Sequence, residues 1–392
     1  MGKALKYRGN FMQKTAKVGV FIIIVNFLIY IGLGLPDSVL GSAWPAVRQT
    51  YHVNVDYVGY LTAISLVCSF GSTLLYPKLS AKLTMDRIMM LSMWFVLIGL
   101  LALMWGQAVW LLIVAAIAMG FGQGAIDIAV NDYAAKRFSS GLMSILHGMY
   151  GVGVTLSSFV MALSLVFPMG WRLGVLSVIV LQVVIMAVVM SSRQAFRGSD
   201  TAVTDDEMTT VKLAGSDWLL PVFYFVYGVE LVIGKYVSSF AVDHWQYSAT
   251  TATNVATLFW AGLMVGRFLT GVTTRWQSNR RLILTHIILT AIATGMMFLP
   301  VEALLPFAGF GLGLGLSAIY PLMMMVPYAR YNDQKAKRVV SWNLAFCQAG
   351  MVVLPLVTGW TYQAVGAMSL PIIILILVGA MLGLGSVILR QN

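Results

Sequence analysis

Apolar runs of about twenty residues, separated by short polar breaks, recur along almost the whole chain. Because the core of a bilayer needs about 20 apolar residues per helix, each run predicts a membrane-spanning helix. The predicted spans cover residues 18–44, 55–77, 87–106, 108–135, 141–168, 171–192, 217–242, 250–274, 281–299, 301–328, 338–364 and 368–389. The pattern therefore predicts an all-α integral membrane protein with twelve transmembrane helices.

The overall composition supports this interpretation. Of the 392 residues, 59 % are hydrophobic and 10 % are charged, whereas soluble proteins carry about 25 % charged residues. A soluble enzyme is therefore excluded as the default class. The two cysteines, Cys68 and Cys347, lie inside apolar runs and lack the spacing of metal ligands, so they are interpreted as packing residues. We expect no metal and no cofactor.

The formal net charge of +11 is distributed unevenly along the chain. Lysines and arginines lie before the first span, in the even-numbered connections and after the last span, whereas only Arg48 and Arg172 fall in the odd-numbered connections. Since cytoplasmic loops are enriched in cations, both termini are predicted to be cytoplasmic. The first run is longer than the apolar segment of about 7–15 residues in a signal peptide, so it is kept as a helix. The positive charge thus predicts topology and no nucleic-acid partner.

The hydrophilic stretch 193–216 lies near the midpoint and separates six spans from six. We therefore expect an N-terminal six-helix bundle over 1–192, a cytoplasmic central loop over 193–216 and a C-terminal six-helix bundle over 217–392. The halves resemble each other weakly at three places, namely 83–87 with 276–280, 120–124 with 311–315, and 148–153 with Gly350 and Gly359. The glycines follow no strand and lie within apolar runs, so they predict close helix packing and not a phosphate-binding loop.

Several short motifs occur in a fixed order along the chain. They are 34–38 (GLPDS) with 43–45 (AWP), 120–124 (GFGQG) followed by Asp127 and Asn131, 147–151 (HGMYG), 227–230 (YGVE), and Gly266-Arg267 with Gly271. With these motifs the chain resembles the major facilitator superfamily over all twelve spans and the central loop, and is most similar to the fucose-permease-like group of sugar/proton symporters. The resemblance implies two pseudo-symmetric six-helix bundles, alternating access and proton-coupled sugar transport.

The chain departs from the superfamily's pattern in two places. In the loop between spans two and three, Ala81 and Thr84 replace the aspartate and glycine of the family motif, and Lys82, Asp86 and Arg87 are the candidates for a substitute charged latch. In span five, residues 151–157 lack the glycine-proline motif typical of drug/proton antiporters. The second departure counts against an exporter.

Three acidic residues within spans are candidate proton-coupling groups, because a charge at membrane depth costs about 2.5–3.5 kcal/mol. Asp37 follows Pro36 in span one, where the proline removes a backbone hydrogen bond. Asn26, Tyr30 and Asp37 share one helical face. The alternative for Asp37 is a capping carboxylate near the outer surface.

The other two carboxylates are Asp127 and Glu230. Gln123, Asp127 and Asn131 recur every fourth residue, so they form one column that faces protein or water, with a structural hydrogen-bond ladder as the alternative. Glu230 lies one turn after Tyr227. Lys235 follows five residues later, about 140° further around the helix, and does not face it. A buried charge pair that holds helices together is the alternative for Glu230.

Two further polar residues in spans are interpreted as structural or gating groups. Arg267 shares a face with Trp260 near the cytoplasmic end of span eight, where a gate-stabilising ion pair or a snorkelling side chain is expected. His147 is a lone imidazole, which in a helix bundle is more often a packed, hydrogen-bonded residue than a proton relay.

The resulting hypothesis is a proton symporter for a small polar solute, with a sugar as the favoured class. It would act as a monomer in the cell membrane with substrate, protons and lipid as its partners. The predicted substrate-binding residues are Asn26, Tyr30, Gln123, Asn131, Tyr227, Asn254, Trp260, Trp342, Asn343 and Gln348. The alternative is a proton-coupled multidrug exporter, which the 24 methionines favour because methionine lines adaptable sites.

Overall fold

The computed structural model describes residues 19–138, 140–196 and 213–390, and all regular secondary structure within these ranges is helical. The first half contains α2 (Val20–Tyr51), α3 (Tyr57–Ser80), α4 (Met85–Trp105), α5 (Val109–Arg137), α6 (Ser140–Ser164), α7 (Trp171–Ser191) and η1 (Arg193–Phe196). The second half contains η2 (Gly215–Trp218), α8 (Leu219–Tyr227), α9 (Val229–Trp245), α10 (Ala249–Thr273), α11 (Asn279–Met296), η3 (Glu302–Leu304), α12 (Leu305–Ser317), α13 (Ile319–Met323), α14 (Val326–Arg330), α15 (Asp333–Val365) and α16 (Ser369–Arg390). Most of the predicted central loop and the cations before residue 19 lie outside the described residues.

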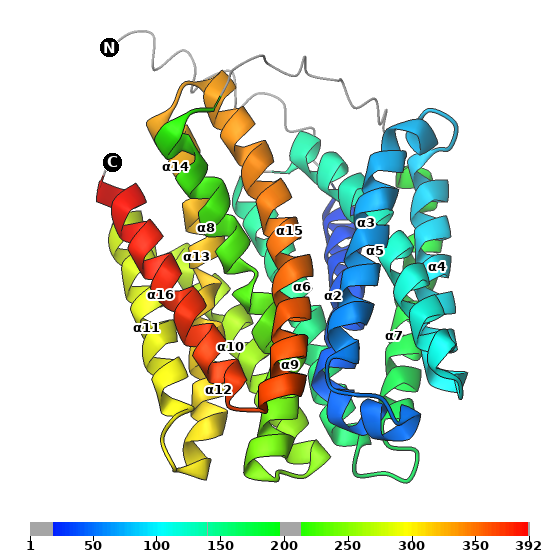
Figure 1. Cartoon of the computed structure of the whole chain (residues 1–392). Coiled ribbons are helices and arrows are strands. Elements are labelled where there is room, and N and C mark those ends of the chain that lie inside the picture. Colours follow the sequence, from blue (N-terminus) through cyan, green and yellow to red (C-terminus); the bar gives the residue numbers. More distant parts are fainter. Residues whose placement is uncertain (1–18, 139, 197–212, 391–392) are drawn as a thin grey trace, which may run out of the picture.

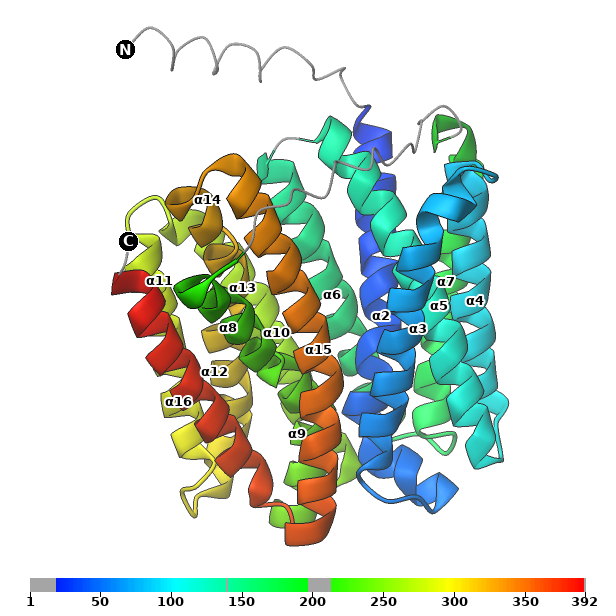
Figure 2. The ribbon, with the colours of Figure 1, turned by 45° about the horizontal axis from the view of Figure 1, so that its top comes forward.

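The helices form two bundles that stand side by side, α2–α7 in one and α8–α16 in the other (Figures 1 and 2). The described chain begins and ends at the same end of the molecule, with Val20 and Arg390, and we call this the terminal end. The other end, where α2 stops at Tyr51 and α9 at Trp245, is called the far end. The boundary between the bundles runs from one end to the other.

Eleven segments of the described chain are long and apolar enough to cross a membrane. The remaining predicted span, 281–299, corresponds to α11, which is 18 residues long and carries Arg280 and Arg281 in its first turn. These two cations lower its mean hydropathy but leave an apolar stretch after them. The predicted all-α architecture of twelve transmembrane helices is therefore confirmed.

The helices differ from the predicted spans where prolines and glycines intervene. The span predicted over 217–242 is divided at Gly228 into α8 and α9. The span predicted over 301–328 is divided into α12, α13 and α14. Since proline lacks the N–H that would bond to the residue four positions earlier, Pro321 and Pro327 each interrupt the helix within the preceding turn.

Helix α2 continues past residue 44, where the predicted span ended, and includes both Pro36 and Pro45. Pro45 leaves the carbonyl of Gly41 without its donor inside the helix. The hydroxyl of Ser238 on α9 donates to this carbonyl at 2.6 Å. A defect in one bundle is thus filled by a donor from the other.

The glycine clusters pack helices closely, as predicted. A Cβ at Gly120 or Gly124 of α5 would lie 2.2 Å from the Ser65 oxygen and 2.1 Å from the Ser69 oxygen of α3. In the other bundle, a Cβ at Gly313 of α12 would lie 1.9 Å from a main-chain oxygen of α10. Both clusters bring a helix into main-chain contact with its neighbour at corresponding places of the two bundles.

The residues of the altered loop motif lie at the terminal end, between α3 and α4. Lys82 and Arg87 are exposed, whereas Asp86 is buried in the first turn of α4. Their role as a charged latch stays a prediction.

Candidate functional site

Asp37 lies within α2 at the boundary between the bundles, and both of its carboxylate oxygens accept hydrogen bonds. Gln123 of α5 donates through Nε2 to Oδ1 at 2.6 Å. The hydroxyl of Tyr150 on α6 donates to Oδ2. Gln123, predicted as a substrate ligand, therefore holds the candidate proton-binding carboxylate in place. Charge-assisted bonds of this kind are among the stronger hydrogen bonds in proteins.

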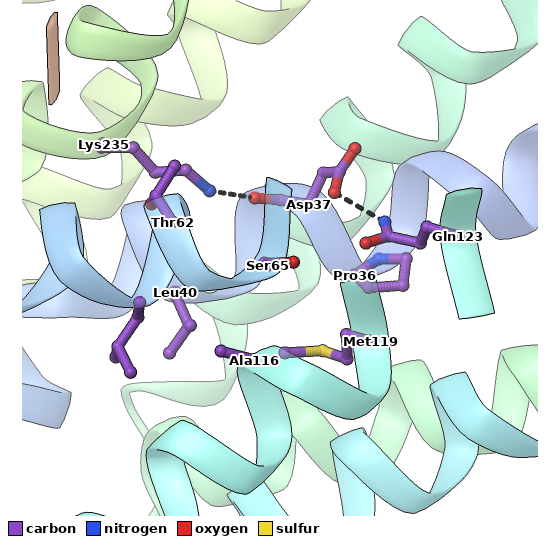
Figure 3. Close-up of a pocket in the computed structure, with 10 residues that line it drawn as sticks. Pro36, Asp37, Leu40, Thr62, Ser65, Ala116, Met119, Gln123 and Lys235 are labelled. Atoms are coloured by element: carbon purple, nitrogen blue, oxygen red, sulfur yellow. Dashed lines mark hydrogen bonds between the residues drawn. The ribbon is translucent and has the colours of Figure 1, made fainter. Parts of the chain in front are cut away.

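Lys235 of α9 reaches the same segment from the opposite bundle. Its Nζ donates to the main-chain oxygen of Asp37 at 2.7 Å (Figure 3). The residue is only 8 % exposed. Lys235 was not predicted as a site residue, although a lysine in the middle of an apolar span is itself a signal of function.

A second polar group lies nearer the terminal end, around Asp127 of α5. Asn131 donates from Nδ2 to Asp127 Oδ1 at 2.9 Å, and the buried hydroxyl of Tyr30 lies beside both residues. The ring of His147 contacts Tyr30 edge to face at 5.3 Å between centroids. Tyr30 precedes Asp37 by seven residues, so this group stands about 10 Å closer to the terminal end. Asp127 and His147 are exposed.

Glu230 is the carboxylate of the second bundle, and it lies in the first turn of α9 directly after the break at Gly228. Tyr227 donates its hydroxyl hydrogen to Glu230 Oε2, and Arg267 Nη2 of α10 lies 3.5 Å from the same oxygen. A helix N-terminus favours a negative charge. The break lies at a point of close packing, since a Cβ at Gly228 would lie 2.6 Å from the carbonyl carbon of Gly350 on α15.

Tyr150 lies between Asp37 and the ion pair of Glu230 and Arg267. Besides its bond to Asp37, its hydroxyl lies within electrostatic range of Glu230 and Arg267. Sequence reasoning missed this residue as a functional candidate. Its position in the 147–151 motif, three residues after His147, was the available signal. Around Tyr150 the polar residues of the two bundles form one site.

The remaining predicted substrate residues are more scattered. Trp260 is buried against Gly234 of α9, where an added Cβ would lie 2.4 Å from its ring. Trp342 belongs to an aromatic cluster with Trp218, at 5.1 Å between ring centroids. The structure therefore does not bring Trp342 into the group around the carboxylates.

The predicted amides also occupy different environments. Asn343 is fully buried, and neither polar atom of its side chain has a hydrogen-bond partner within the described part of the chain. Asn26 is also fully buried and bonds to its own helix at Ile22. Asn254 is exposed in the second turn of α10, near the far end. Gln348 is exposed and lies two turns before Pro355, on the side of α15 that meets α3.

The bundles are closed against each other at the far end. Arg48 of α2 forms an ion pair with Asp243 of α9, and Tyr362 of α15 donates to the same carboxylate at 3.1 Å. Nearer the middle, a Cβ at Gly41 would lie only 2.3 Å from the Gly234 oxygen, so α2 and α9 touch through their main chains. Asp127 and His147, which lie nearer the terminal end than Asp37, are exposed.

Among residues 19–138, 140–196 and 213–390, no group of three or more His, Cys, Asp or Glu side chains is placed to hold a metal ion. The site consists of charged, amide and phenol side chains on helices of both bundles. Such side chains can bind polar solutes and exchange protons with water.

Comparisons with known proteins agree with this architecture. The model of the Major Facilitator Superfamily matches residues 22–300. The glucose/mannose transporter of Bacillus subtilis (strain 168) is 20 % identical over 358 residues, which are 86 % of this chain and 87 % of that protein. The bypass of stop codon protein 6 of Saccharomyces cerevisiae is 19 % identical over 288 residues, 66 % of this chain and 58 % of that protein.

Solved structures of transporters share the fold. A mutant of a nucleoside transporter matches with a TM-score of 0.75 and 11 % identity, over 95 % of this chain and 99 % of that one. A D-xylose-proton symporter matches with a TM-score of 0.70 and 13 % identity, over 92 % and 97 %. The fucose:proton symporter of E. coli matches with a TM-score of 0.62 and 12 % identity, over 93 % and 98 %. The family model covers most of the chain, and the chain therefore belongs to the Major Facilitator Superfamily of multi-pass membrane transporters.

Proposed function

We propose that this transporter moves a sugar together with a proton across the cell membrane by symport. The observation that carries the proposal is the convergence of Asp37, Asp127 and Glu230 on the boundary between the two bundles. In transporters built from two related halves, substrate and coupling-ion sites lie at such a boundary near the middle of the membrane. The carboxylates are the proton-binding candidates, and the amides and phenols beside them are the donors and acceptors for sugar hydroxyls.

The substrate class is supported by the neighbours of Asp127. Tyr30 and Asn131 present a hydroxyl and an amide beside this exposed carboxylate, and the rings of Tyr227 and Tyr320 lie 5.5 Å apart across from them in the second bundle. A sugar offers hydroxyls to Asp127 and Asn131 and an apolar ring face to Tyr320, which are the accessible members of these groups, whereas Tyr30 and Tyr227 are buried behind them. Sugar transporters also stand among the relatives of the chain.

The orientation follows from the distribution of cations. With both termini in the cytoplasm, the terminal end is the inner end and the far end is the outer one. The conformation described here is then closed to the outside and open to the cytoplasm. Alternating access moves the bundles of residues 1–192 and 217–392 relative to each other around the site in a single chain.

The test is uptake by proteoliposomes that contain the purified protein and maintain an imposed proton gradient. The panel consists of labelled hexoses and pentoses, nucleosides, and cationic dyes. We expect accumulation of at least one sugar, with collapse of the accumulation by a protonophore. Extrusion of dyes without accumulation of any sugar would establish the multidrug exporter instead. Accumulation of nucleosides alone would refute the substrate class but not the symport.

The coupling residues are tested by Asp37→Asn, Asp127→Asn and Glu230→Gln. We expect at least one variant to lose gradient-driven accumulation, because an amide cannot bind and release the proton. Glu302→Gln is the matched control, since Glu302 is an exposed carboxylate in a connection. If all three variants accumulate sugar as well as this control does, the carboxylates do not carry the proton.

A further inference from the structure

Lys235 carries a positive charge across the boundary between the bundles. It belongs to α9, but its ammonium group binds the main-chain oxygen of Asp37 in α2 at 2.7 Å. Its stem lies along Gly41, where an added Cβ would be 3.1 Å from the lysine Cδ. The ammonium group has three N–H donors and a single acceptor among the contacts described here. A buried cation with so few hydrogen bonds needs a negative partner nearby.

Lys235 and Asp37 both line one small cavity. Its volume is about 30 Å³, and Thr62 and Ser65 of α3 also line it (Figure 3). A cavity of this size admits about one water molecule and no sugar. The polar residues among those that line the cavity are Asp37, Thr62, Ser65, Gln123 and Lys235.

Other charged and titratable groups around Asp37 come from both bundles, and Glu230 and Arg267 of the second bundle lie within electrostatic range of the Tyr150 hydroxyl. Tyr150 faces it from α6 through a hydrogen bond, and Asp127 of α5 is an electrostatic neighbour. Thr62 and Ser65, from α3, are uncharged. Lys235 from α9, in the second bundle, is the cation whose side chain binds the main chain of Asp37.

Because Lys235 and Asp37 belong to different bundles, the distance between them changes during transport. When the bundles part at the far end, α9 withdraws from α2, and Lys235 and its neighbour Ser238 leave with it. Gln123 and Tyr150 stay with Asp37 because α2, α5 and α6 move as one bundle. The charge that faces Asp37 therefore depends on which end is closed.

We propose that Lys235 is a tethered counter-cation that displaces the proton from Asp37 when the far end closes. The inference rests on the proposed proton symport. With the far end open, Asp37 has no cation beside it and binds a proton from that side. Closure brings the Lys235 ammonium group to the cavity, the O–H bond of the Asp37 carboxyl group breaks, and the proton passes to water on the terminal side. The carboxylate that remains is balanced by the ammonium group.

The experiment compares Lys235→Met with two other variants in proteoliposomes. Lys235→Arg keeps the charge. Ser238→Ala is the matched control, because it removes a neighbouring hydrogen bond from the same pair of helices without changing any charge. Two quantities are measured for each protein, namely the exchange of labelled for unlabelled sugar without a gradient, and the accumulation ratio under a pH difference of one unit.

We expect the wild type and Ser238→Ala to accumulate sugar up to about tenfold, the limit set by one proton per sugar at that gradient. Lys235→Met keeps exchange within about threefold of the wild type, but its accumulation ratio falls to about one. Lys235→Arg recovers accumulation at least in part. Exchange shows that a variant is folded, since it requires complete conformational cycles with bound sugar.

Two results would overturn the inference. One is accumulation by Lys235→Met at the wild-type ratio. The other is loss of both exchange and accumulation in Lys235→Met and Lys235→Arg alike, which would mark the lysine as a packing element. If Lys235→Met loses exchange and accumulation but Lys235→Arg keeps these two activities, the charge itself is required and the inference stands. Failure of the proposed symport is a separate observation, because the wild type would then accumulate no sugar.

Discussion

The contact between the main chains of α2 and α9 leads to a quantitative prediction for Gly41→Ala. The added methyl group would lie 2.3 Å from the Gly234 oxygen and 3.1 Å from the Lys235 Cα. Ordinary van der Waals contacts of Cβ atoms begin at 3.4 Å, so the helices must part by about 1 Å. Both obstructing atoms belong to the main chain and cannot rotate away.

The expected effect is on the equilibrium between conformations. Overpacking a filled interface costs about 1–3 kcal/mol. This cost applies only while the far end is closed, because in the opposite conformation α9 no longer lies against Gly41. The ratio of far-end-open to far-end-closed molecules should therefore rise by a factor of about 5–150.

Pulsed electron paramagnetic resonance measures this ratio as a distance distribution. Spin labels are attached to cysteines that replace Asn54 and Gln246, two exposed residues at the far end of different bundles. Cys68 and Cys347 are replaced by alanine in every protein. We expect a longer distance to gain population in the Gly41→Ala protein at the expense of the wild-type distance.

Gly271→Ala is the control for the intrinsic effect of alanine on a helix. Gly271 lies in α10, and an added Cβ there meets no atom within 4 Å. It should leave the distance distribution unchanged. A distribution for Gly41→Ala that is indistinguishable from this control would refute the idea that main-chain contact at Gly41 holds the far end closed.

Three further predictions concern the ion pairs and the packing. Asp243→Asn removes the ion pair with Arg48, in which the side chains of Arg48 and Asp243 are 18 % and 26 % exposed. We expect the closed far end to lose about 1 kcal/mol or less of stability, with a small gain in the population of the long spin-label distance. Arg267→Met leaves the Glu230 carboxylate without its cation and lowers the melting temperature in detergent, and adding Glu230→Gln restores part of the loss. Gly313→Ala places a Cβ 1.9 Å from a main-chain oxygen and should destabilise the fold by about 3 kcal/mol, read from the same melting curves.

Each of these predictions has its own check. The effect of Asp243→Asn should shrink at high salt, where the wild-type pair is itself screened, and an equal effect at all salt concentrations would contradict it. If the loss of stability in the double variant equals the sum of the losses in the two single variants, Arg267 and Glu230 do not interact. Gly379→Ala, at an open position of α16, should melt like the wild type.

The number of spans could be predicted from the sequence because the bilayer itself sets the length of apolar segment that each span needs. This requirement does not depend on which helices are neighbours. The breaks within spans were harder to predict. Helix α8 ends next to Gly228, where the main chain of Gly350 of α15 lies close by, and this contact joins residues far apart in the chain. The interruption of the tenth span had a local signal in Pro321, which the apolar pattern concealed.

The candidate site was predicted residue by residue but not as a whole. Asp37, Asp127 and Glu230 stood out because a charge in an apolar span is unusual. The five-residue spacing correctly indicated that Lys235 does not face Glu230. In the structure each of them has a partner on another helix. Spacing along one helix cannot identify such partners, which is why the contact between Lys235 and Asp37 required the three-dimensional fold.

The charges at the boundary also determine which step of the transport cycle depends on the membrane voltage. The site contains three carboxylates, Asp37, Asp127 and Glu230. It also contains two cations, Lys235 and Arg267, so the fully ionised site carries one negative charge and a single proton makes it neutral. Each elementary charge that crosses the membrane is worth about 2.3 kcal/mol per 100 mV. Under the proposed symport, the loaded carrier then crosses without net charge, while the empty carrier returns as an anion. An inside-negative potential should accelerate this return and raise the maximal rate of uptake, whereas delivery of the bound sugar is indifferent to voltage.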